Sequence, residues 1–432
     1  MKTYWKYIAV VIFGTLLISI SYFTFRYEST LLIGQFVILF ALYLFSADRK
    51  NDFTLKEIIA FGIIFRLLLL LLTPNLSEDV YRFLWDGKLW WEGVDAYAYL
   101  PSVISKENIL SPELFAQLNS PHYYSIYPPL NQLIFAIGGI VENTILGILT
   151  IRLFIILAEI STLIMLPKVL KQYGKDSKLL ILYAFNPLVI LELTGNLHFE
   201  AFVIFFLVWS IYEFERRNVF KSAMGLGLAI SFKLVPLILL ASFFKKLDLK
   251  QYIKFVLLVC LVTIISFLPF LFSDAIEGIL TSTSLYFQNF EFNASLYYLI
   301  REVGFAFKGY NIIATAGPLM GILAFFGMVI FSLIASSKMK LPERMLWTYI
   351  IYFLLATTVH PWYVLPILVL GILSNYKFPV LWSFTIFFTY WGYSQSGYQE
   401  HLGIIAVEYI SLITFIVFEL IQKSNIRKTL HA

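Results

Sequence analysis

Long apolar runs recur from one end of the chain to the other, and they restrict the fold more than any other feature. A helix that crosses a bilayer needs about 17 to 25 apolar residues. We expect spans near residues 7–25, 31–46, 57–73, 144–166, 178–195, 199–214, 219–232, 234–244, 251–272, 312–336, 343–359, 361–374, 378–392 and 402–421. Several of these runs have only half the usual length. The sequence therefore predicts an all-α, polytopic membrane protein with about 12–14 transmembrane helices.

Composition supports this fold class. Of the 432 residues 59% are hydrophobic and only 14% are charged, which is too few polar side chains to coat a soluble globule of this size. Because the apolar runs leave no room for a soluble domain, we predict a single domain over residues 1–432. The net charge of +5 is spread through short loops, so no nucleic-acid partner is expected.

The basic residues predict the orientation in the membrane. Lys and Arg gather in the loops 49–56, 168–178, 216–221, 245–250, 338–344 and 423–428. The positive-inside rule places these loops, and with them both termini, in the cytoplasm. We expect the run 7–25 to be a retained span, and the chain to be a multi-pass protein of the plasma membrane of a bacterium with its active surface outside.

Two segments do not fit this orientation as full spans. Counting residues 128–141 as a span would place the lysine-rich loop 168–178 outside, so we predict a helix lying along the outer face. Residues 219–244 are predicted to form two half-length helices that turn at 231–236, with Lys233 at the outer end. The large first outer loop then covers about residues 74–143.

This outer loop opens with acidic residues. Glu78 and Asp79 are adjacent, and Arg82 and Asp86 follow. Neighbours on a helix point about 100° apart, so we expect one of the first two carboxylates to face a substrate and the other to cap the helix or pair with Arg82. Acids also favour the first helical turn for purely structural reasons. A carboxylate at this boundary is suited to proton transfer.

Further polar and aromatic residues lie at the outer ends of other spans. They are Tyr127, His198, Glu200, Lys233, Arg301, His360, Trp362 and Tyr363. Ionisable residues at membrane depth are costly and are candidates for function, although each alone could be an interfacial side chain. The cations Lys233, Arg301 and Arg82 suit a phosphate, beside acids that could accept a proton. The aromatic side chains are either membrane anchors or stacking surfaces for sugar rings.

No metal site or cofactor is predicted. The histidines are scattered without paired spacing, which argues against a zinc site. A requirement for a divalent metal is left open.

The chain resembles a known family at several motifs. They are EDVYRFLWDG at 78–87, GVDAY at 93–97, YPP at 127–129, FNPL at 185–188, GNLHFE at 195–200, FKLVP at 232–236, FNASLYY at 292–298 and HPWY at 360–363. In this order they are similar to the polyprenyl-phosphate-mannose-dependent mannosyltransferases of the glycosyltransferase-C superfamily. One departure is that three spans precede the acidic loop here, where many members have one.

The resemblance implies an inverting membrane glycosyltransferase that transfers a hexose, mannose in this family, from a polyprenyl-phosphate donor on the outer face. It implies Asp79 as general base, with Glu78 as its neighbour or substitute. Lys233, Arg301 or Arg82 would neutralise the donor phosphate. Asp86, Tyr127, His198, Glu200, His360, Trp362 and Tyr363 would bind substrate.

The acceptor is left open between a glycan, a lipid and a protein hydroxyl, and membrane lipids are expected neighbours. A multi-span transporter or flippase for a lipid-linked or small polar substrate is the alternative. Transporters usually show repeated halves, and no repeat is found in this sequence.

Overall fold

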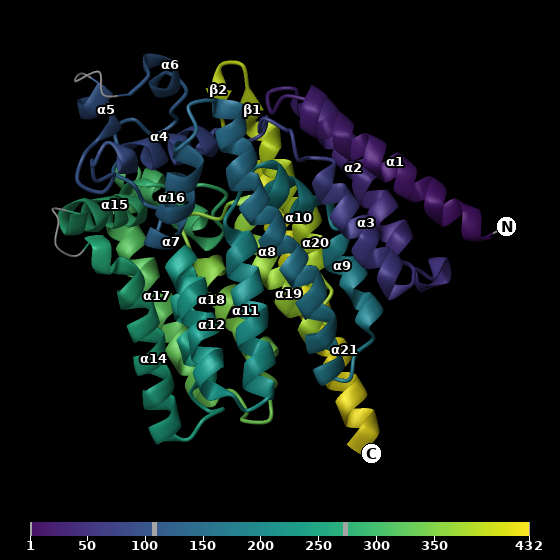
Figure 1. Ribbon diagram of the computed structural model, residues 1–432. Coiled ribbons are helices and arrows are strands. Elements are labelled where there is room, and N and C mark those ends of the chain that lie inside the picture. Colours follow the sequence, from purple (N-terminus) through teal and green to yellow (C-terminus); the bar gives the residue numbers. More distant parts are fainter. Residues whose placement is uncertain (1, 106–109, 271–274, 432) are drawn as a thin grey trace.

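The computed structural model is a bundle of helices that describes residues 2–105, 110–270 and 275–431 (Figure 1). Among these described residues, six helices are long and apolar enough to cross a membrane by themselves. They are α1 (Lys2–Phe23), α2 (Ser29–Ala47), α8 (Thr144–Gln172), α14 (Leu249–Phe267), α17 (Ile313–Ile334) and α21 (Leu402–His431). The predicted all-α, polytopic membrane fold is confirmed.

The other predicted spans consist of shorter or broken helices. They are α3 (Leu55–Leu67), α9 (Ile181–Ala184), α10 (Pro187–Val189), the π-helix η4 (Ile190–Gly195), α11 (Glu200–Glu215), α12 (Val219–Phe232), α18 (Leu341–Leu355), η7 (Pro361–Val364), α19 (Leu365–Ser374), α20 (Phe378–Thr385) and η8 (Ile386–Gly392). The chain bends by 58° between Ser177–Ala184 and Pro187–Gly195, and this pair counts as a seventh span if taken as one. The bend is local, because Pro187 begins a new helix that Asn186 caps.

Short helices cap one end of the bundle. They are α4 (Asp79–Trp91), α5 (Pro101–Ile104), α6 (Pro112–Phe115) and α7 (Pro129–Gly139), of which α4, α5 and α6 lie at the top of Figure 1. The helix expected over 128–141 is therefore present as α7. It packs on α4 backbone to backbone, because a Cβ atom added at Gly87 would lie 1.9 Å from the carbonyl oxygen of Phe135. This close packing fixes the direction of α4, which begins at Asp79.

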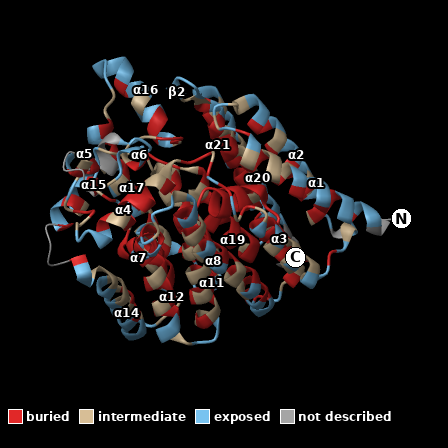
Figure 2. Cartoon of the chain, turned by 45° about the horizontal axis from the view of Figure 1, so that its top comes forward, coloured by how far each residue is buried: buried red, intermediate tan, exposed pale blue. Residues whose placement is uncertain are grey.

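The remaining elements are small or peripheral. They are η1 (Arg49–Asn51), η3 (Ser177–Leu180), η5 (Val235–Leu239), α13 (Leu240–Phe243), η6 (Leu268–Phe270), α15 (Ala275–Asn289), α16 (Leu296–Lys308) and the antiparallel strands β1 (Tyr393–Ser394) and β2 (Gly397–Tyr398). Buried residues concentrate in α19, α20 and their neighbours, whereas α14 and α1 show exposed faces (Figure 2). The exposed face of α14 is apolar, with Leu257 63% and Leu261 53% exposed, as expected where a helix meets lipid.

The chain breaks at Lys233, as predicted. Helix α12 ends at Phe232, and Lys233 is extended, with φ −158° and ψ 133°. Pro236 lies in the first turn of η5, and α13 completes the second half. The two half-length helices of 219–244 are therefore confirmed. Because the backbone is extended at Lys233, the direction of its side chain is not set by α12.

Buried arginines that lie inside the apolar runs hold the centre of the bundle together. Arg66 pairs with Glu159 at 2.6 Å, with both side chains fully buried. Arg152 donates hydrogen bonds to the carbonyl oxygens of Thr194 at 3.0 Å and Leu70 at 3.2 Å. Since Leu70 leads into the acidic loop and Thr194 lies in η4, Arg152 fixes the two segments that precede Asp79 and His198.

Candidate functional site

Asp79 is the first residue of α4, and its carboxylate faces two polar side chains from distant segments. Its Oδ1 accepts a hydrogen bond of 2.8 Å from Asn119 Nδ2. Its Oδ2 lies 3.8 Å from His198 Nε2, and the Asp79 side chain is 23% exposed. The carboxylate is thus oriented by protein groups and still open on one side.

His198 is held by the π-helix η4 and the turn that follows it. Its Nδ1 lies 3.0 Å from the carbonyl oxygen of Glu192 and 3.2 Å from Glu192 Oε2. Leu197, just before it, has a left-handed backbone with φ +65°, which is strained for a leucine. π-helical turns and such strain are both enriched at functional sites. Together they turn the imidazole toward Asp79.

Glu192, which was not predicted as a site residue, completes a line of three ionisable groups with His198 and Asp79. Its side chain is fully buried. Tyr390 Oη donates to its Oε1 at 2.8 Å, and Asn196 Nδ2 donates to its Oε2 at 3.0 Å. The available signal was an acid inside the apolar run 178–195, where a buried charge is costly and marks a candidate site.

The charges of Asp79 and His198 follow from their contacts. Burial would raise the pKa of Asp79, but the contact with His198 and the hydrogen bond from Asn119 bring it below its usual value. Burial would lower the pKa of His198, but Asp79 and Glu192 raise it to about 9. At neutral pH the structure therefore holds a carboxylate at 79 beside an imidazolium at 198.

Lys233 and Glu200 form the second charged part of the site. Lys233 Nζ makes an ion pair with Glu200, the first residue of α11, and lies 3.9 Å from the ring centre of Tyr363. The Lys233 side chain is 25% exposed, whereas that of Glu200 is buried. Burial lowers the pKa of Lys233, and the carboxylates of Glu200 and Asp79 oppose this shift. Lys233 and Asp79 therefore share one electrostatic environment.

Aromatic rings from 360–363 cover the line. Trp362 stacks on His198 with ring centres 3.6 Å apart, and His360 stacks on Trp362 at 4.5 Å. Tyr363 meets His360 edge-on at 5.2 Å. Burial lowers the pKa of His360 to about 3, so this ring is neutral where His198 is charged. The stack forms an aromatic wall beside this line of charges.

Tyr127 lies close to the same charges. Its ring meets that of Phe83 edge-on at 5.0 Å. Burial raises the pKa of Tyr127, and the nearby carboxylates of Asp79, Asp86 and Glu200 act in the same direction. The structure thus brings together most of the residues singled out in the sequence. They are Asp79, Tyr127, His198, Glu200, Lys233, His360, Trp362 and Tyr363.

Glu78 has a different partner from Asp79. It makes an ion pair with Arg26, whose guanidinium lies 4.9 Å from the ring centre of Tyr393. We expected the second carboxylate to cap α4 or pair with Arg82. The Glu78 side chain makes no hydrogen bond that caps α4, and Arg82 pairs with Asp86 instead.

Arg82 and Asp86 are buried partners of each other. Arg82 Nε donates to Asp86 Oδ1 at 2.7 Å, one helical turn along α4. Arg82 also donates to the carbonyl oxygens of Ser120 at 3.0 Å and Tyr123 at 2.8 Å, and Gln132 Nε2 donates to Asp86 Oδ2 at 3.1 Å. These contacts anchor the outer loop on α4 and α7, whereas Arg82 Nη2 is buried without a hydrogen-bond partner among the described residues.

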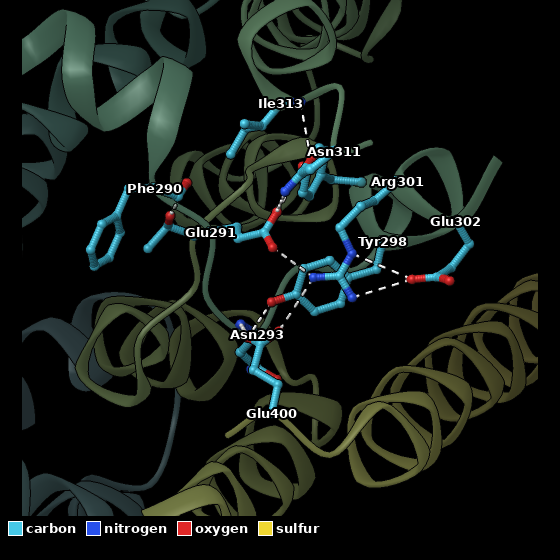
Figure 3. Close-up of polar contacts among 11 residues, drawn as sticks. Phe290, Glu291, Asn293, Tyr298, Arg301, Glu302, Asn311, Ile313 and Glu400 are labelled. Atoms are coloured by element: carbon cyan, nitrogen blue, oxygen red, sulfur yellow. Dashed lines mark hydrogen bonds and ion pairs between the residues drawn. The ribbon is translucent and has the colours of Figure 1, made fainter. Parts of the chain in front are cut away.

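Arg301 lies in a different cluster, on α16 (Figure 3). Its guanidinium pairs with Glu291 at 2.7 Å, with Glu302 at 3.3 Å and with Glu400 at 3.6 Å. One cation facing three carboxylates is a poor receptor for a phosphate. Within residues 2–105, 110–270 and 275–431, no group of three or more His, Cys, Asp or Glu side chains could hold a metal ion.

The His198 contacts predict a pH-dependent stability. Because the folded state raises the pKa of His198 from 6.5 to about 9, its stabilising effect is fully present below about pH 6.5 and is lost as the pH rises through about 9. The apparent melting temperature of the detergent-solubilised protein should fall over this interval, and that of His198→Gln should fall less. Parallel curves for the two proteins would contradict the assignment of the charge to His198.

A comparison with known families gives one match. The family model described as "Alpha-(1->6)-mannopyranosyltransferase, N-terminal domain" matches residues 7–245. No curated protein and no solved structure matches the chain significantly. The matched part contains Asp79, His198, Glu200 and Lys233, and the ring stack at 360–363 lies beyond it.

Proposed function

Because the chain belongs to the alpha-(1->6)-mannopyranosyltransferase family, it is a membrane mannosyltransferase, and we propose that its donor is a polyprenyl-phosphate mannose. The acceptor in this proposal is a hydroxyl of a glycan, and Asp79 is the general base. The observation that supports the proposal is that a partly exposed carboxylate, Asp79, and a partly exposed cation, Lys233, both adjoin the ring stack at 360–363, Asp79 through His198 and Lys233 over Tyr363.

The site is proposed to face the outside of the membrane. Helix α19 begins two residues after Tyr363 and ends at Ser374. At that far end Lys175, from a lysine-rich loop, donates to the carbonyl oxygen of Ile372 at 3.0 Å. The site and this basic loop thus lie at opposite ends of one helix, and basic loops favour the cytoplasmic side. An outward-facing enzyme needs a donor anchored in the membrane, because sugar nucleotides do not cross it.

The proposed reaction is a single displacement with inversion. The acceptor oxygen forms a bond to the anomeric carbon, the bond from that carbon to the phosphate oxygen breaks, and polyprenyl phosphate leaves with the electron pair. The acceptor proton moves to Asp79. Although His198 makes Asp79 a weak base, the hydroxyl becomes acidic as its oxygen bonds to carbon, so a weak base suffices.

The remaining residues have supporting roles in this proposal. Lys233, and the imidazolium of His198, offset the negative charge that develops on the leaving phosphate. Glu192 holds the His198 ring in place from behind. The stacked rings of His198, Trp362 and His360 would form one wall of the sugar site and exclude water.

The direct test is mannose transfer by washed membranes that contain the protein. Labelled polyprenyl-phosphate mannose should yield a labelled glycan, and labelled nucleotide mannose should not when polyprenyl phosphate and its charging enzyme are absent. Transfer from the nucleotide alone would contradict the proposed donor. Flipping or uptake of the labelled lipid without transfer would favour the transporter alternative.

A further inference from the structure

Three lysines from distant segments gather at the C-terminal end of α19. They are Lys175, which follows α8, Lys340, which caps the start of α18, and Lys423 of α21. Figure 1 shows the C-terminal end of α21 at the bottom of the bundle and α4, which begins at Asp79, at the top. This lysine cluster has no role in the proposed mannosyl transfer, so it needs its own explanation.

Two of the lysines donate hydrogen bonds to the end of α19. Lys175 Nζ donates to the carbonyl oxygen of Ile372 at 3.0 Å and to Asn375 Oδ1 at 2.5 Å. Lys423 Nζ donates to the carbonyl oxygen of Ser374 at 3.3 Å. The C-terminus of a helix carries about half a negative charge. The end of α19 therefore offsets only part of the two positive charges that it binds.

Tyrosine rings support the other side of the cluster. Lys340 Nζ lies 5.4 Å from the ring centre of Tyr173, and Lys423 Nζ lies 3.0 Å from that of Tyr376. A ring attracts a cation but does not cancel its charge. Because Lys340 is exposed and Lys175 and Lys423 are half-buried, a ligand can approach the cluster from solvent.

The environment of Lys175 shows that these charges act on one another. Burial lowers the pKa of Lys175 to about 8, the charges of Lys340 and Lys423 act in the same direction, and Glu343 opposes them. At neutral pH Lys175 is still mainly protonated, so like charges are held together at a cost. An anion bound among them would reduce this cost.

Acids near the cluster are fewer than the cations and have neutral partners. Glu343 accepts a hydrogen bond of 2.9 Å from Tyr376 Oη, and Glu419 accepts from the backbone N–H groups of Lys377 and Phe378. The segments 168–178, 338–344, 374–378 and 419–428 together contain eleven Lys and Arg residues and three Asp and Glu residues. This end of the bundle is therefore strongly positive.

The cluster borders an apolar surface that is suited to lipid. On α21, Val417 is 48%, Leu420 is 43% and Ile421 is 56% exposed, and Lys423 follows within one turn. This helix is long and apolar enough to cross a bilayer. A ligand that uses both surfaces has an anionic head and apolar chains, whereas a free phosphate ion would use the lysines alone.

We propose that Lys175, Lys340 and Lys423 bind the phosphate head group of an acidic phospholipid, whose acyl chains lie along the exposed apolar face of α21. Basic pockets between membrane helices on the cytoplasmic side suit anionic head groups, and the proposed orientation places the lysine cluster on that side. The inference goes beyond mannosyl transfer and depends on neither the proposed donor nor the proposed base.

The test is native mass spectrometry of the purified protein with equal amounts of phosphatidylglycerol and phosphatidylcholine that carry the same acyl chains. Wild type should retain phosphatidylglycerol in preference. Each single change among Lys175→Gln, Lys340→Gln and Lys423→Gln should lower the affinity for this lipid about fivefold, and the triple variant should show no preference. Equal retention of both lipids by wild type, or an unchanged preference in the triple variant, would overturn the proposal.

A matched control removes as many charges from another basic part of the chain. The triple variant Lys245→Gln, Lys250→Gln, Lys254→Gln should keep the preference for phosphatidylglycerol, because these exposed lysines lie in or beside the loop before α14. Loss of the preference in this control would mean that total charge attracts the lipid, and it would refute the site. Lys340→Gln alone changes an exposed side chain, so its fivefold effect remains measurable if the triple variant does not fold.

A second control separates a lipid from a soluble anion. Phosphatidylglycerol should raise the melting temperature of the detergent-solubilised wild type, and inorganic phosphate at the same concentration should not. Equal stabilisation by phosphate would overturn the assignment to a lipid. Since mannosyl transfer enters none of these measurements, failure of the proposed reaction would leave their outcome unchanged.

Discussion

Replacing Asp79 with asparagine is expected to lower mannosyl transfer by about a hundred- to ten-thousand-fold, the range typical for loss of a general base. Asparagine keeps the volume of the side chain, and its carbonyl oxygen can still accept the hydrogen bond from Asn119. It cannot take up a proton. The rate should be measured in membranes at saturating polyprenyl-phosphate mannose, so that a change in donor affinity does not enter.

Glu78→Gln is the matched control for this variant. Glu78 is the adjacent carboxylate, but it pairs with Arg26 and not with His198. We expect it to retain most of the wild-type rate. Size-exclusion profiles of both purified variants would show whether the fold is intact. Full activity of Asp79→Asn would remove Asp79 from the role of base and would shift attention to the Glu192–His198 pair.

Replacing Lys233 with methionine is expected to raise the KM for the donor about tenfold to a hundredfold, because a hydrogen bond to a charged group is lost. Methionine keeps the apolar stem that lies against Tyr363. The measurement is the dependence of the transfer rate on polyprenyl-phosphate mannose at fixed acceptor. The KM for the acceptor should stay within about twofold of its wild-type value.

The Lys233 variant needs a second control, because it leaves the buried Glu200 carboxylate without its cation. An unpaired buried charge can destabilise a protein by about 3 to 5 kcal/mol. The double variant Lys233→Met, Glu200→Gln removes both charges and should recover stability without recovering donor use. If the single variant shows an unchanged donor dependence, Lys233 does not bind the phosphate.

Much of the architecture could be predicted because it follows from local patterns. Apolar length identified the helices, and Pro236 together with the charge at 233 located the break after α12. The orientation of Asp79 against Glu78 could not be predicted, because it depends on Arg26, which lies in a different segment. Sequence spacing fixes the angle between two neighbours on a helix, but it says nothing about which partners surround them.

The residues that complete the site were hidden for the same reason. Glu192 and Arg152 lie inside apolar runs. The length of such a run predicts a span, but it does not predict the contacts of a single charged residue within it. Asn119 has no distinguishing neighbours in the sequence, and its value comes from the 2.8 Å contact with Asp79. Arg82 and Arg301 were expected at a phosphate because of their charge, and the structure instead surrounds them with carboxylates and carbonyl groups.

The distance along the chain between Asp79 and the ring stack at 360–363 has a consequence for biosynthesis. During translation the acid, the imidazole and the lysine emerge first, and they are inserted into the membrane well before the rings that cover them have been made. A nascent chain that stops after residue 245 would hold the charged groups without their aromatic wall. Two fragments divided within the lysine-rich stretch 245–250 and produced in one cell would therefore have to associate in the membrane before they could show transferase activity.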